Sequence, residues 1–114
     1  MLKQETLATR AYPQALKTGE PVALDPVELT GEQVTAEFEE DLADRGELIE
    51  TLRQGPVLHP VPEMPQATTF SIDGPTKNFW IKLFYSPEDP SRIGRVHIMG
   101  VSRRGSPLQP LSVD

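Results

Sequence analysis

The stretch that decides the fold is KNFWIKLFYSPEDPSRIGRVHIMGVSRRG, residues 77–105, which contains most of the aromatic residues of the chain. Residues 78–85 place apolar side chains on both faces of an extended chain, a pattern typical of a central strand. PEDP at residues 87–90 predicts a loop. Residues 95–101 then put Val96 and Ile98 on one face and His97 on the other. The stretch therefore predicts an antiparallel hairpin at the centre of a sheet.

A third strand is indicated just before this hairpin. Thr68, Phe70 and Ile72 fall on one face of an alternating run, and Asp73-Gly74-Pro75 predicts the turn that follows it. Further back, residues 56–66 (PVLHPVPEMPQ) contain four prolines. Because proline cannot donate a ladder hydrogen bond, this segment is expected to be a stiff, extended connector and not a central strand.

A helical segment is predicted over residues 31–54. Thr30 and Gln33 have the spacing of a capping box, and Val34, Phe38 and Leu42 recur every four residues. The helix either continues through Gly46 or ends there and is followed by a second helix. Gly55-Pro56 marks the end of the segment in both cases.

The predicted fold class is α+β, with one or two N-terminal helices packed on a three- to four-stranded antiparallel β-meander. The predicted domain organisation is a proline-interrupted N-terminal arm (residues 1–29), a single α+β domain (residues 30–104) and a C-terminal tail (residues 105–114). Pro13, Gly19, Pro21 and Pro26 interrupt the arm and limit it to short elements.

Composition excludes several function classes. The 114 residues include no cysteine, so disulfides, thiolate nucleophiles and cysteine-ligated metals are excluded. No apolar run is long enough for a signal peptide or a membrane span, which predicts a soluble, cytoplasmic protein. The sequence has none of the phosphate-binding, nucleophile-elbow or zinc-helix motifs, so no cofactor or metal is expected.

Charge is distributed unevenly along the chain, whose formal net charge is −6. Residues 1–66 contain 13 acidic and 5 basic residues, whereas residues 67–114 contain 4 and 6. The polar face of the predicted helix supplies much of this acidity. A non-catalytic protein-binding or regulatory module, such as an adaptor, an inhibitor or an immunity-type protein, is therefore the leading hypothesis, with a basic partner engaged by Glu37, Glu40, Asp41 and Asp44.

The alternative hypothesis uses the basic C-terminal hairpin. A small metal-independent nuclease or RNA-binding protein would need a histidine as acid or base and cations to hold a phosphate. The residues available for these roles are His97, Arg95, Arg103 and Arg104, with Lys82 nearby. The acidic balance makes nucleic acid the less favoured partner. Homodimerisation through a sheet edge is compatible with either hypothesis.

Overall fold

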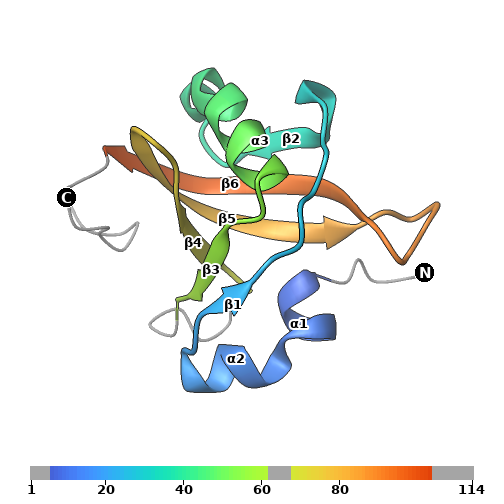
Figure 1. Ribbon diagram of the computed structural model, residues 1–114. Coiled ribbons are helices and arrows are strands. Elements are labelled where there is room, and N and C mark those ends of the chain that lie inside the picture. Colours follow the sequence, from blue (N-terminus) through green and yellow to red (C-terminus); the bar gives the residue numbers. More distant parts are fainter. Residues whose placement is uncertain (1–5, 62–67, 104–114) are drawn as a thin grey trace.

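The computed structural model describes residues 6–61 and 68–103, and it has a mixed α+β fold (Figure 1). The described strands form a six-stranded sheet in the order β1-β3-β4-β5-β6-β2. Neighbouring strands are antiparallel except for β2, which runs parallel to β6. The α+β prediction is confirmed, but the predicted meander is only the centre of this larger sheet.

The elements follow one another in a mixed order along the chain. The strands are β1 (Val22–Ala23), β2 (Val34–Ala36), β3 (Val57–Pro60), β4 (Phe70–Asp73), β5 (Lys77–Tyr85) and β6 (Ile93–Arg103). The α-helices are α1 (Leu7–Ala11), α2 (Pro13–Thr18) and α3 (Arg45–Arg53), and the 3-10 helices are η1 (Gly31–Gln33) and η2 (Glu39–Asp44). None of the helices in this part of the chain is long and apolar enough to cross a bilayer.

The central hairpin of β5 and β6 follows the sequence prediction and adds two irregularities of register, one between Trp80 and Ile81 and one between Phe84 and Tyr85. Trp80 pairs with Gly100, whereas Ile81 pairs with Ile98, so Met99 is an extra residue in β6. Such a bulge shifts the alternation of side chains by one position. The even-numbered residues Val96 and Ile98 therefore face the core before this bulge, and the odd-numbered Val101 faces it afterwards.

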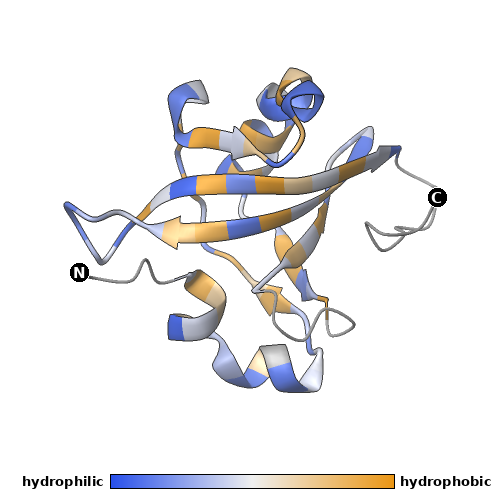
Figure 2. Cartoon of the chain, turned by 180° about the vertical axis from the view of Figure 1, so that it is seen from behind, coloured by the Kyte–Doolittle hydropathy of each residue, from blue (hydrophilic) through white to orange (hydrophobic). Residues whose placement is uncertain are grey.

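One face of the sheet carries the hydrophobic core. Phe79, Ile81 and Leu83 of β5 are fully or almost fully buried, because α1 and α3 cover this face. The helices contribute apolar side chains to the same cluster, namely Leu7 and Ala8 from α1 and Leu48 and Leu52 from α3. Hydrophobic and hydrophilic residues alternate along β6 (Figure 2), as expected of a strand with one face in the core.

The predicted α-helix over residues 31–54 is wrong for residues 31–44, which form two short 3-10 helices with strand β2 between them. Only Arg45–Arg53 is α-helical, and Gly46 lies in the first turn of α3 instead of ending a helix. Val34 and Thr35 pair with β6, whose chain is about sixty residues away in sequence. Because β-branched residues favour strands, this distant pairing outweighs the local helical pattern.

The capping pair forms at the predicted place but starts a shorter element. The backbone N–H of Thr30 donates to Oε1 of Gln33 at 2.9 Å, and the Gln33 N–H donates to the Thr30 carbonyl at 3.0 Å. The Gln33 amide also donates to the Gly94 carbonyl at 3.1 Å. The pair therefore closes a single 3-10 turn and fixes it to the start of β6.

The predicted connector is also wrong over Val57–Pro60, which forms strand β3 between β1 and β4. Its register pairs Pro60 with Phe70 and His59 with Ser71. Pro56 precedes the strand and Pro60 is its last residue, so Val57, Leu58 and His59 keep their backbone donors. Residues 62–66 of the predicted connector lie outside the described residues.

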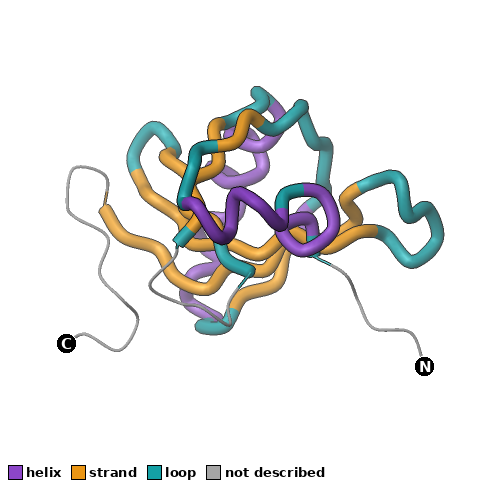
Figure 3. The backbone as a smooth tube through the Cα atoms, turned by 90° about the horizontal axis from the view of Figure 1, so that it is seen from below, coloured by secondary structure: helices purple, strands orange, loops and turns teal. Residues whose placement is uncertain are grey.

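Residues 6–29 pack on the rest of the molecule. Thr6 caps α1 by accepting a hydrogen bond from the Thr9 N–H at 3.2 Å. Pro13 begins α2, and Gly19 ends it with a left-handed φ of 78°. Helices α1 and α2 lie across one side of the molecule (Figure 3). Leu24 and Leu29 join the same core as the strands, and the predicted tail lies outside the described residues.

Candidate acidic binding surface

The predicted acidic residues lie on a 3-10 helix and the segment before it. Glu39, Glu40 and Asp41 occupy the first turn of η2, where the free N–H groups and the helix dipole favour negative charge. Phe38 precedes this turn in an extended conformation, and its carbonyl accepts from the Asp41 N–H at 2.9 Å. The acidic surface, defined here as residues 37–44, is therefore not the face of a long α-helix.

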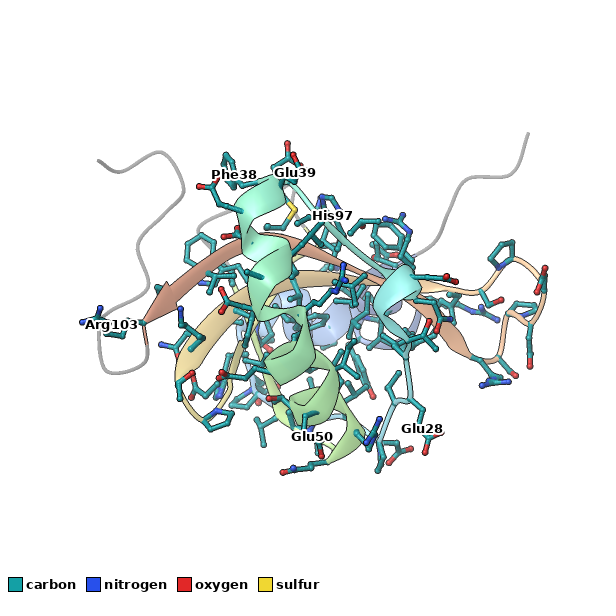
Figure 4. All side chains as sticks on the ribbon, turned by 90° about the horizontal axis from the view of Figure 1, so that it is seen from above. Glu28, Phe38, Glu39, Glu50, His97 and Arg103 are labelled. Atoms are coloured by element: carbon teal, nitrogen blue, oxygen red, sulfur yellow. The ribbon has the colours of Figure 1, made fainter. Side chains whose placement is uncertain are left out.

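Phe38 is the apolar residue at the centre of this surface. Its exposed fraction is 47%, and Val57 is the only other large apolar side chain of comparable exposure among the described residues. Phe38 and Glu39 project together at one edge of the molecule, on the side where His97 lies (Figure 4). Sequence reasoning had assigned Phe38 to a buried helical stripe and did not identify it as a surface residue.

The carboxylates of the acidic surface influence one another. The pKa of Asp41 is raised, first by partial burial and then by the charges of Glu40 and Asp44, although Lys77 acts in the opposite direction. The Lys77 ammonium lies 3.5 Å from the Asp44 carboxylate and offsets the negative charge at the Asp44 end of the acidic surface. Within residues 6–61 and 68–103, no cation forms an ion pair with Glu39 or Glu40. These two carboxylates are therefore available to a partner.

A chain of hydrogen bonds fixes the other end of the surface to the sheet. Arg95 donates to the Thr35 hydroxyl at 3.1 Å, and that hydroxyl lies 2.7 Å from Nδ1 of His97. Nε2 of His97 lies 3.2 Å from Oε1 of Glu37. With a neutral imidazole, Thr35 donates to Nδ1 and the Nε2–H donates to Glu37, so that each group in the chain is satisfied. Glu37 is thereby held beside Phe38.

The basic residues of the alternative hypothesis are brought together only in part. His97 pairs across the strands with Lys82, and Arg95 stacks on the Phe84 ring at 4.1 Å from its centroid. Arg103 pairs with Lys77, and the bulge at Met99 places this pair on the opposite face of the sheet from His97.

Arg103 also lies six residues from His97 along β6, a separation of about 20 Å, at the far end of the strand (Figure 4). Arg104 lies outside the described residues. A phosphate held by Arg103 would therefore be out of reach of the His97 imidazole.

No catalytic or metal-binding arrangement stands out elsewhere in the described residues. Among them, no three histidine, aspartate or glutamate side chains gather closely enough to hold a metal ion. Comparison with protein families, with curated proteins and with solved structures finds no match. Function has to be argued from the surface chemistry of this chain alone.

Proposed function

We propose that this protein is a non-catalytic binding module whose acidic surface, residues 37–44, engages a basic patch on a partner protein. The observation that carries the proposal is Phe38, which is 47% exposed and directly flanked by carboxylates. Interfaces are often built from an aromatic anchor inside a ring of polar side chains. Phe38 supplies the anchor, and Glu37, Glu39 and Glu40 supply part of the ring.

The energetic contribution of the anchor follows from its exposed area. A phenylalanine side chain with about half of its area exposed has about 90 Å² to bury, which corresponds to about 2 kcal/mol of binding free energy. The carboxylates act mainly on the rate of association, because long-range attraction accelerates encounter and is screened by salt. Affinity is therefore expected to depend on Phe38, and its salt sensitivity on the acidic residues.

The conformation of the surface supports this role. The Glu37 backbone N–H donates to the Ile98 carbonyl at 2.8 Å, which extends the pairing of β2 with β6 up to the residue before Phe38. The 3-10 turn of η2 fixes the residues that follow. Because the anchor is held between two ordered segments, less conformational entropy is lost on binding than for a flexible loop.

The test is affinity capture from native lysate with four forms of the protein. The wild type and the control Glu50→Lys, which changes an exposed carboxylate on α3, are expected to retain the same protein. Phe38→Ala and Glu40→Lys are expected to lose it. Figure 4 shows Glu50 on the opposite side from Phe38, so the control leaves the acidic surface intact.

Nuclease treatment of the lysate separates the two hypotheses. Capture that survives nuclease and is released at raised salt supports the acidic surface. Recovery of RNA or DNA, or of proteins that are lost after nuclease treatment, would contradict it and would favour the face that carries Lys82, Arg95 and His97.

A further inference from the structure

A cleft separate from the acidic surface opens between helix α1, residues 24–28 and the β5–β6 hairpin. Its volume is about 540 Å³, which lies within the usual range of small-molecule sites. Figure 1 shows α1 beside the end of β5, next to the chain that leaves β1. Leu7, Leu24, Val27 and Ile93 provide apolar lining that is continuous with the hydrophobic core.

The rim of the cleft carries charges of both signs. Asp25 and Glu28 lie on one wall, both exposed, and neither forms an ion pair with any described residue. Arg92 lies on the hairpin wall. The pKa of Asp89 nearby is lowered, mainly by hydrogen bonds from Ser91, with a smaller effect of the Arg92 charge. No carboxylate of the described residues forms an ion pair with Arg92.

The walls are held in place before any ligand arrives. Arg10 of α1 donates to the Pro90 carbonyl of the hairpin at 2.6 Å, and its guanidinium stacks on Tyr85 at 4.4 Å from the ring centroid. Tyr85 and Tyr12 both line the cleft. Two aromatic side chains, an apolar floor and fixed walls are the usual composition of a small-molecule site.

We infer that this cleft binds a small zwitterion with an apolar body, of the class of free amino acids with a large apolar side chain. The ammonium group would lie toward Asp25 and Glu28, and the carboxylate would lie toward Arg92. The apolar side chain would cover Leu24, Val27 and Ile93. A ligand with only one charge leaves one wall uncompensated, so the inference predicts a preference for molecules that carry both charges.

The experiment is an NMR titration of the backbone amides of the whole chain with L-phenylalanine, phenethylamine and 3-phenylpropionate. L-phenylalanine is expected to shift amide signals around Val27 and Ile93. Each single-charge analogue, which lacks either the carboxylate or the amine, is expected to bind at least about fivefold more weakly. The inference would be overturned if either analogue bound as tightly as L-phenylalanine. It would also be overturned if L-phenylalanine caused no shift at 10 mM, which is roughly the weakest dissociation constant expected of such a site.

Substitutions on the two walls of the cleft test which wall binds the carboxylate of the ligand and which binds its ammonium group. Arg92→Gln is expected to weaken L-phenylalanine and leave phenethylamine unchanged, and Glu28→Gln is expected to weaken L-phenylalanine and leave 3-phenylpropionate unchanged. Glu50→Gln, on α3, should alter neither and serves as the matched control. An unaltered response of Arg92→Gln to L-phenylalanine would contradict the assignment. Glu28 lies far from Phe38 and Glu39 in Figure 4, so this result is independent of the proposed protein-binding function.

Discussion

Glu47 connects helix α3 to the β4–β5 turn, and its removal should destabilise the fold measurably. One carboxylate oxygen accepts from the backbone N–H groups of Thr76 at 2.8 Å and Lys77 at 2.9 Å, and the other accepts from the Thr76 hydroxyl at 2.5 Å. Hydrogen bonds to a charged group contribute about 1.5–3 kcal/mol each when buried, and less when partly exposed as here. Glu47→Ala should therefore lower the free energy of unfolding by about 2–3 kcal/mol.

The pH dependence of this loss is a second part of the same prediction. Burial alone would raise the pKa of Glu47, but the hydrogen bonds from Thr76 and Lys77 and the Lys77 charge outweigh it, so the pKa lies below its ordinary value of 4.5. A carboxyl group whose pKa is lowered by folding stabilises the protein above its unfolded pKa. That stabilisation is lost as the pH falls through the folded pKa. The difference between wild type and Glu47→Ala should therefore shrink below pH 4.5.

Urea unfolding at pH 7 and at several lower pH values measures both effects. Glu50→Ala is the matched control, because Glu50 is an exposed carboxylate of the same helix whose ion pair is with Arg53 at 3.2 Å. Its loss should be below about 1 kcal/mol. The reasoning is refuted if Glu47→Ala costs no more than Glu50→Ala, or if its cost stays constant as the pH falls.

Four further substitutions test other parts of the fold. Thr69 is fully buried and its hydroxyl has no hydrogen-bond partner among the described residues, so Thr69→Val should stabilise the protein by about 1 kcal/mol in thermal or urea unfolding; a loss of stability would contradict this. Gly55 has a φ of 72°, and a Cβ there would lie 2.9 Å from the Leu24 carbonyl oxygen, so Gly55→Ala should cost about 2 kcal/mol or more. Gly46→Ala, in open space on α3, should instead stabilise by about 0.5–1 kcal/mol, and equal effects of the two changes would be inconsistent with the structure. Phe38→Ala should lower the free energy of unfolding by about 1–2 kcal/mol, because about half of the residue is buried in the fold; a loss above about 3 kcal/mol would mean that Phe38 belongs to the core.

The central strands could be predicted because their signal is local. In β5 and β4 the alternation of apolar side chains, such as Phe70 and Ile72, directly reflects which face is buried. Asp73-Gly74-Pro75 marks the turn, and the Gly74 N–H closes it on the Lys77 carbonyl at 2.7 Å. These features depend only on neighbouring residues, so the sequence was sufficient.

Strand β2 could not be predicted because its partner is distant in sequence. Val34, Phe38 and Leu42 happen to recur at helical spacing, but Val34 is buried through its pairing with Val96 and Phe38 is exposed. The bulge at Met99 could not be predicted either, since nothing in the local sequence shows which residue of β6 is unpaired. Both features follow from the assembly of the whole sheet.

The sequence indicated the acidic residues of the candidate site, but not their 3-10 conformation or the exposed aromatic residue among them. The acidic residues were identified from charge alone, and Glu40 and Asp41 do lie together on one surface. The anchor was missed because an apolar residue in a periodic pattern is normally assigned to the core. The one available signal was the sequence EFEE, in which Phe38 has an acidic residue on each side.

The most direct test of the account is the binding kinetics of the captured partner with wild type, Phe38→Ala and Glu50→Lys by surface plasmon resonance. The account predicts that Phe38→Ala weakens affinity about 30-fold, mainly through faster dissociation, while Glu50→Lys has little effect. It also predicts that raising the salt concentration slows association of the wild type. Unchanged affinity of Phe38→Ala, with association insensitive to salt, would contradict the proposal that residues 37–44 form the binding surface.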